Sequence, residues 1–223
     1  ESAIEILNIA VELNSNLADA YQNRGIAKDE LKDYQGALAD YNMALEINPR
    51  DALTYHNRGN TKYSLGDDIG AIADYTIAID LLSYISGSYY GRGLSKMVLT
   101  DFDGAILDFN KAIVINPDFT MPYFNRGLAK AQAGDFEGSI QDLTKFIEND
   151  STNVFAYDYR GTSKINIADY EGAMADFNKA IEIDPAFAKA YHNFGTTFYK
   201  LGRYDEAAET FKKAMAIDPE EPE

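Results

Sequence analysis

The sequence has no cysteine, only two histidines and far fewer basic than acidic residues. Without cysteine, the 223-residue chain forms no disulfide, thiolate metal site or cysteine nucleophile, and its redox compartment stays open. The 20 basic and 36 acidic residues give a formal net charge of −16, which disfavours nucleic acids and anionic lipid surfaces as partners. The sequence also lacks a run of about 18 apolar residues, so we expect no direct membrane insertion.

What the sequence does contain is an internal repeat. Pro49, Pro117, Pro185 and Pro219 are separated by 68, 68 and 34 residues, which makes 34 residues the natural repeat length. A repeat without insertions predicts that each copy is the same supersecondary element, stacked on its neighbours in one continuous domain. In this register a leading segment, 1–17, precedes six repeats, at 18–51, 52–85, 86–119, 120–153, 154–187 and 188–221.

Each repeat carries two helical patterns with a turn between them. In the first half a tyrosine and a glycine recur four residues apart, as in Tyr55 and Gly59, and mark one helical face. In the second half, Ala71, Tyr75 and Ala78 show the i, i+4, i+7 spacing of an amphipathic helix. A glycine placed to end the first helix separates the halves of three repeats, at Gly66, Gly134 and Gly202. Each repeat is therefore predicted to be a helical hairpin, with small residues where its two helices approach.

This pattern resembles the tetratricopeptide repeat (TPR) family, whose motif has aromatic residues at positions 4 and 24, Gly or Ala at 8, Ala at 20 and 27 and Pro at 32. The resemblance covers all six repeats. Residues 1–17 match the second helix of an incomplete repeat, with Ala3, Leu7 and Ala10 at its small-large-small positions. The resemblance implies an all-α fold, a right-handed α-solenoid of stacked antiparallel helix hairpins (a TPR superhelix).

One repeat departs from the motif more than the others. Repeat 120–153 has Ser139, Leu143 and Phe146 where alanine, tyrosine and alanine are expected. Leu143 is smaller and Phe146 larger than the usual residue, so we interpret the change as a roughly volume-conserving swap in one layer of the core.

A second repeated pattern is ionic. The first five repeats carry arginine at position 7 and lysine at position 11, so two cations lie one helical turn apart. Like charges at this spacing destabilise a helix by about 0.2–0.5 kcal/mol, so a compensating anion is expected, and the aspartate at position 23 is the candidate. In the sixth repeat all three residues change together, to Phe194, Phe198 and Thr210. We interpret the set as a structural ion-pair array rather than an anion-binding stripe. Its members are Arg24, Arg58, Arg92, Arg126, Arg160, Lys28, Lys62, Lys96, Lys130, Lys164, Asp40, Asp74, Asp108, Asp142 and Asp176.

The TPR resemblance also implies where a partner binds. In that family the first helices of successive hairpins line a concave groove, into which positions 2, 5, 9, 12 and 13 point. Here these positions change from acidic in the first repeat (Asp19, Glu30), through apolar in the middle, to mildly basic in the last (Lys189, Lys200). Apolar residues on a face that the hairpin core does not need indicate a partner surface. The predicted partner-binding groove comprises Leu53, His56, Asn60, Tyr63, Tyr90, Leu94, Met97, Met121, Phe124, Leu128, Phe155, Asp158, Ile165 and His192.

Other kinds of site find no support in the sequence. TPR proteins that bind a partner's terminal carboxylate use lysine, asparagine and arginine in consecutive repeats, whereas here His56 and Asn60 are followed by Gly91. His56 and His192 lie four repeats apart, too distant in a stacked solenoid to share a metal. The acidic residues recur with the repeat, and the glycines lack a phosphate-binding motif. We therefore predict no enzyme activity, no metal site and no cofactor.

The leading hypothesis is a protein–protein interaction scaffold that binds a peptide or an amphipathic helix in the apolar groove. The alternative is a self-assembling module that forms a homo-oligomer through its ends or groove. We expect Ile4, Leu7 and Val11 to be poorly covered, and no polar capping helix follows Pro219. We expect a soluble protein of unknown compartment, because the start at Glu1 does not distinguish bacterial cytoplasm from periplasm.

Overall fold

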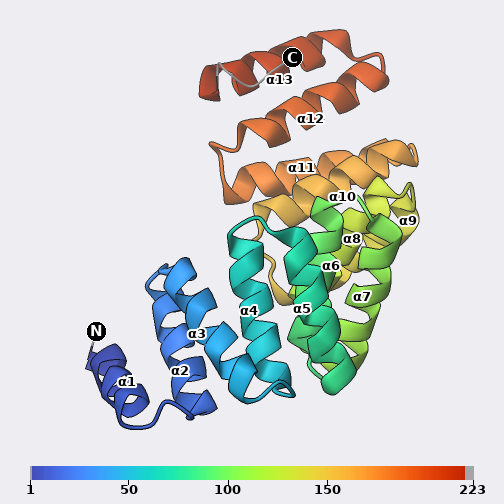
Figure 1. Ribbon diagram of the computed structural model, residues 1–223. Helices are drawn as coiled ribbons and strands as arrows, with labels where there is room; N and C mark the ends of the chain where they lie inside the picture. Colours follow the sequence, from blue (N-terminus) through green and yellow to red (C-terminus); the bar gives the residue numbers. More distant parts are fainter. Residues whose placement is uncertain (1, 219–223) are drawn as a thin grey trace. The chain divides into compact units, whose positions relative to one another are not determined.

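The computed structural model describes residues 2–218, and α-helix is the regular secondary structure throughout this part of the chain (Figure 1). The first helices of the repeats are α2 (Ala18–Glu30), α4 (Ala52–Ser64), α6 (Ser86–Val98), α8 (Met121–Gln132), α10 (Val154–Asn166) and α12 (Ala188–Lys200). The second helices are α3 (Tyr34–Ile47), α5 (Asp68–Leu81), α7 (Phe102–Ile115), α9 (Phe136–Asn149), α11 (Tyr170–Ile183) and α13 (Tyr204–Ile217), and α1 (Ser2–Leu13) precedes them. None of these helices is long and apolar enough to span a bilayer. Pro219 lies outside the described residues.

The helices group into two compact bodies that divide between Phe119 and Thr120. The N-terminal body contains α1 to α7 and the C-terminal body contains α8 to α13. Within each body, a first helix packs against the second helix of its own repeat, and that second helix packs against the next first helix. Each body is thus a stack of antiparallel helix hairpins (Figure 1), which confirms the predicted fold class. The grouping of all six repeats into one continuous domain stays a prediction.

Each hairpin turn contains one residue in the left-handed conformation. Glycine takes this place in three repeats, as the sequence predicts, and non-glycine residues take it in the others. After Gly66, the Asp67 amide donates to the Lys62 carbonyl at 2.9 Å and closes the first helix. The Asp67 carboxylate then accepts from the Gly70 amide at 2.9 Å and caps the second helix. The six left-handed residues are Lys32, Gly66, Thr100, Gly134, Ala168 and Gly202.

The repeated glycine in each first helix makes room for the aromatic residue of the second helix. A Cβ atom on Gly59 would lie 2.9 Å from Cε1 of Tyr75, and one on Gly161 would lie 2.7 Å from Cε1 of Phe177. Both rings are buried, as are the alanines that flank them in their helices. Close approach of the two helices therefore depends on the missing side chain.

The divergent fourth repeat keeps a buried core with different side chains. Ser139, Leu143 and Phe146 are all buried, as the volume-conserving interpretation requires. A Cβ atom on Gly127 would lie 3.0 Å from Leu143 Cγ, a wider gap than the aromatic rings leave elsewhere. Phe146 packs against Phe124, with ring centroids 5.0 Å apart, so the larger residue fills the space beside the smaller one.

Helix α1 differs from expectation in the face that it buries. We predicted poor cover for Ile4, Leu7 and Val11, and this was wrong: Val11 is buried, and Leu7 packs against the cluster that α1 shares with α2 and α3. The exposed apolar face of α1 consists instead of Ile6, Ile9 and Leu13.

Candidate partner-binding surface

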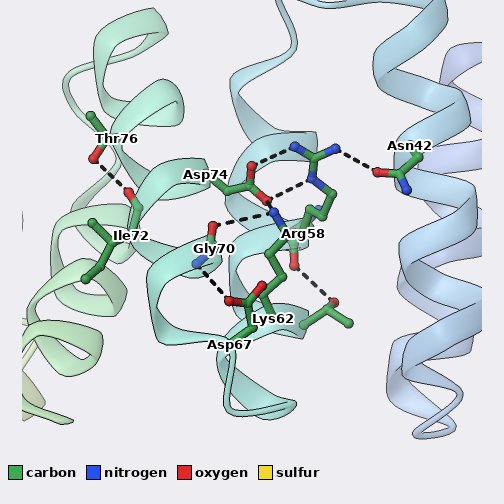
Figure 2. A network of polar contacts seen from close by, with 10 residues as sticks. Asn42, Arg58, Lys62, Asp67, Gly70, Ile72, Asp74 and Thr76 are labelled. Carbon is green, nitrogen blue, oxygen red and sulfur yellow. Dashed lines mark hydrogen bonds and ion pairs between the residues drawn. The ribbon is translucent and has the colours of Figure 1, made fainter. Parts of the chain in front are cut away.

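The predicted ion-pair array forms, and each member is a cluster of three side chains between the two helices of one hairpin. In the second repeat, Arg58 Nε and Nη2 donate to the two carboxylate oxygens of Asp74 at 2.8 and 2.6 Å (Figure 2). Lys62 Nζ lies 2.8 Å from the Asp74 oxygen Oδ2. The Asp74 side chain is only 2% exposed, and its hydrogen bonds raise the pKa of the Arg58 guanidinium.

The same cluster also reaches the preceding repeat. Arg58 Nη1 donates to Asn42 Oδ1 of α3 at 2.7 Å (Figure 2), and its guanidinium lies over the Tyr55 ring, 5.3 Å from the centroid. Lys62 Nζ donates to the Gly70 carbonyl at 3.5 Å. Because these donors are directed at protein groups, the cluster fixes α4 against α3 and α5 and is not available to an external anion.

The sixth repeat replaces the charges with rings. Phe194 and Phe198 stack with centroids 4.6 Å apart, and the Arg203 guanidinium lies over Phe198 at 4.5 Å. Thr210, in place of the aspartate, donates to the Glu206 carbonyl at 2.7 Å. In the sixth repeat the three changed residues therefore replace the ion-pair cluster with largely apolar packing at the same place in the hairpin.

The predicted groove residues share one face of the first helices, because positions 2, 5, 9 and 12 fall on the same side of an α-helix. Three of them are the most exposed: Leu53 and Phe155 at 51% and Met121 at 40%. All three occupy position 2 of their repeats. With the exception of Asp158, the other predicted residues are partly buried. We use the term first-helix face for the predicted groove residues without Asp158.

Some of the partly buried residues are held by rings of neighbouring elements. Tyr90 packs against Phe109 and Phe119, with centroids 5.9 and 4.8 Å apart. Phe124 lies beside Phe146 and Tyr159 in the C-terminal body. These two residues therefore contribute to packing with one side of the ring and to the surface with the other.

Asp158 was assigned to the groove, but its side chain is completely buried. Asn193 Nδ2 donates to Asp158 Oδ1 at 2.6 Å. Lys189 Nζ lies 3.2 Å from Oδ2 without the alignment of a hydrogen bond, and also sits over the Tyr159 ring at 4.6 Å. Asp158 thus links α10 to α12, and we exclude it from the proposed binding surface.

Five of the predicted residues converge on one pocket of about 350 Å³ in the N-terminal body. The pocket lies between α4 and α6, which pack against each other, and Tyr75 of α5 forms part of its wall. Sequence reasoning missed four of its residues as site residues: Ser64, Tyr75, Gly87 and Gly91. For the two glycines the sequence contained a signal: positions 2 and 6 carry larger side chains in all of the remaining repeats. We call this cavity the glycine pocket; its lining comprises His56, Asn60, Tyr63, Ser64, Tyr75, Gly87, Tyr90, Gly91 and Leu94.

A chain of hydrogen bonds orders one wall of the glycine pocket. The Tyr75 hydroxyl donates to Asn60 Oδ1 at 2.7 Å, and Asn60 Nδ2 lies 3.2 Å from His56 Nε2. Because an amide nitrogen only donates, Nε2 accepts, which leaves the proton on Nδ1, 3.0 Å from Ser88 Oγ. Burial lowers the pKa of His56 and raises that of Tyr75, so both side chains stay neutral near pH 7. The wall is thus uncharged, with its polar atoms directed at one another.

Both the repeats and the fold are similar to those of known proteins. A tetratricopeptide repeat model matches residues 18–51, another matches 188–221, and a TPR repeat model matches 169–202. No curated protein sequence matches the chain.

Several solved structures are similar. YrrB, a TPR protein with an unusual peptide-binding site, is 26% identical, with a TM-score of 0.72 over 81% of this chain and 93% of its own. MamA is 25% identical, with a TM-score of 0.69 over 72% of this chain and 94% of its own. A tetratricopeptide repeat protein from Parabacteroides merdae is 23% identical, with a TM-score of 0.69 over 97% of this chain and 86% of its own. Together with the helical hairpins, the matched repeats and these likenesses show an array of tetratricopeptide repeats, a fold that supports a general role as a protein-interaction scaffold.

Proposed function

We propose that this scaffold binds a peptide or an amphipathic helix on its first-helix face. The observation that carries the proposal is the exposure of Leu53, Met121 and Phe155 at the same position of three repeats. None of them is needed to fill a hairpin core, and exposed apolar groups that recur on one face favour contact with another chain. The similarity to YrrB, which has a peptide-binding site, supports the same kind of ligand.

Apolar contacts of this kind contribute favourably to the free energy of binding. Burying a large apolar side chain contributes about 1.5–3 kcal/mol before the cost of ordering the peptide. An amphipathic helix would supply apolar residues at intervals of three and four along one side, which exposed apolar residues of a first helix can contact. The exposed acidic residues Asp19 and Glu30 on α2 favour a partner with basic residues outside its apolar face.

The test uses short synthetic peptides selected from a random library for binding to the intact chain. Leu53→Asp should weaken a selected peptide that binds the N-terminal body at least tenfold, and Phe155→Asp one that binds the C-terminal body, because a carboxylate would be buried against an apolar group. Val114→Asp is the matched control: Val114 is 76% exposed, but it lies on the second helix α7. Equal loss of affinity in Val114→Asp, or unchanged affinity in both first-helix variants, would contradict the proposal.

One observation favours self-association as a second candidate. The apolar face of α1, formed by Ile6, Ile9 and Leu13, is exposed and follows one side of the helix. If copies associate through it, light scattering should show a mass that rises with concentration, and Ile9→Asp should abolish the increase. A constant monomer mass at all concentrations would exclude this candidate.

A further inference from the structure

We propose that the glycine pocket accepts one aromatic side chain of the partner peptide. The inference rests on the proposed function and deepens it, because it names the residue class that the N-terminal body selects. Its basis is the pocket that two glycines of α6 border and the chemistry of the groups around it.

Gly87 and Gly91 lie one turn apart on α6, on the side that meets α4 and α5. A Cβ atom on Gly91 would lie 2.5 Å from Tyr75 Cζ, and one on Gly87 would lie 3.1 Å from His56 Cε1. Glycine weakens a helix because it has more backbone freedom to lose than any other residue. Gly91 lies against the buried ring of Tyr75, as Gly93 lies against Phe109, but Gly87 and Gly91 also line the pocket.

The same positions are occupied in the other repeats. Position 6 carries an asparagine or a tyrosine in each of them. The third repeat therefore has two glycines beside the pocket, at positions where the other repeats carry side chains. Position 2 carries Asp19, Leu53, Met121, Phe155 and Lys189.

The lining favours an uncharged ring. Tyr63, Tyr75, Tyr90 and His56 present ring surfaces to the pocket, and Leu94 adds an aliphatic group. The polar atoms of His56, Asn60 and Tyr75 are engaged in the hydrogen-bond chain that ends at Ser88. Aromatic side chains gain edge-to-face or offset contacts in such surroundings, whereas a charged group would lose its hydration without compensation.

The dimensions match a side chain better than a large ligand. A volume of about 350 Å³ lies near the lower limit of ordinary small-molecule sites, which span about 300–1,000 Å³. Leu53 is exposed on α4, the helix that contributes His56, Asn60 and Tyr63, so one peptide can contact both Leu53 and the pocket.

The direct test is a titration of the intact chain, labelled with ¹⁵N at its 16 glycines, followed by NMR. The probes are N-acetyl-phenylalanine amide, N-acetyl-leucine amide and N-acetyl-lysine amide. The phenylalanine probe should shift the Gly87 and Gly91 resonances saturably and bind at least threefold more tightly than the leucine probe. Gly127 and Gly161, in the C-terminal body, are internal controls and should not shift.

A variant then separates the pocket from the rest of the surface. Gly87→Leu introduces leucine, the residue that the second repeat carries at the same position as Leu53. The leucine side chain should block the cavity and abolish the shift of the Gly91 resonance. Met121→Leu, at the equivalent position of the fourth repeat, is the matched control and should leave the shift intact. Thermal melting by circular dichroism checks that both variants fold; if Gly87→Leu does not, Leu94→Trp is the second blocking variant.

The outcomes distinguish this proposal from the broader function. Saturable shifts with the phenylalanine probe support the pocket even if no peptide binds elsewhere on the first-helix face. No shift at Gly87 and Gly91, or equal binding of the lysine probe, overturns the pocket even if peptides bind. Peptide affinity that is unchanged in a folded blocking variant also overturns it, while leaving the proposed function in place.

Discussion

At the residue scale, the hairpin turns contain a left-handed position that three repeats fill with a non-glycine residue. Thr100 is the most unfavourable of these because a β-branched side chain is strained at its φ of 62°. Replacing Thr100 with glycine should raise the free energy of unfolding by about 1 kcal/mol. The left-handed conformation costs an L-residue roughly 1–2 kcal/mol, and glycine offsets part of this gain because it increases the conformational freedom of the unfolded chain. Urea denaturation would measure the change. Gly134→Thr should lower stability at the equivalent turn, and a stabilised Gly134→Thr would refute this explanation.

His56 should make stability depend on pH in a defined direction. Burial lowers its pKa in the folded chain, so the unfolded chain binds a proton at a higher pH than the folded chain does. The contribution of His56 to the free energy of unfolding is therefore fully present above the pKa of about 6.5 that the residue has in the unfolded chain. This contribution decreases as the pH falls toward the lower pKa of the folded chain. Urea midpoints at pH 7.5 and 5.5 should differ less in His56→Gln than in the unmodified chain. A difference in His56→Gln as large as in the unmodified chain would contradict this expectation.

At the scale of the element, the ion-pair array fixes each first helix against its partner. Arg58→Ala should destabilise the chain by about 3 kcal/mol, because Asp74 would remain buried with only Lys62 beside it. The triple variant Arg58→Phe, Lys62→Phe and Asp74→Thr, which copies the sixth repeat, should recover most of this loss. Lys145→Ala removes an exposed pair with Glu148 and should leave the urea midpoint unchanged. Equal stability of Arg58→Ala and the unmodified chain would show that the cluster is dispensable.

The helix glycines should differ in their tolerance of a side chain. Gly161→Ala brings a Cβ atom to within 2.7 Å of the Phe177 ring and should destabilise the chain by about 1–3 kcal/mol. Gly127→Ala meets Leu143 at 3.0 Å, where a flexible side chain can move and the helix gains about 1 kcal/mol of propensity. Its stability should thus stay within about 1 kcal/mol of the unmodified chain. Thermal melts of the two variants compare them directly, and a larger loss in Gly127→Ala would contradict the packing explanation.

The limits of prediction from the sequence are also clearest at this scale. Hairpins and ion pairs were predictable because their residue types recur at a fixed spacing, as in Arg58, Lys62 and Asp74. The burial of Asp158 was not, because it depends on Asn193 and Lys189 of the next repeat. The glycine pocket was missed because it depends on how side chains of α4, α5 and α6 meet around Gly87 and Gly91, which the repeat motif does not specify.

At the scale of the whole molecule, the surfaces of first and second helices differ more clearly in the C-terminal body than in the N-terminal body. The first-helix face combines apolar residues with the glycine pocket. Second helices of the C-terminal body instead carry exposed ion pairs such as Lys145–Glu148 and Lys179–Glu182, whose polar side chains favour solvation. Second helices of the N-terminal body expose the apolar residues Leu107 and Val114, which makes them a stringent comparison for any claim about the first helices.

The most direct test of the central claim is hydroxyl-radical footprinting of the intact chain with and without a selected peptide. The proposed function predicts that the bound peptide covers first-helix side chains and lowers their oxidation, at Leu53 if it binds the N-terminal body and at Met121 and Phe155 if it binds the C-terminal body. Leu107 and Val114 should react equally in both samples. Protection of Leu107 and Val114, with Leu53, Met121 and Phe155 unchanged, would place the partner on the second helices and contradict the account.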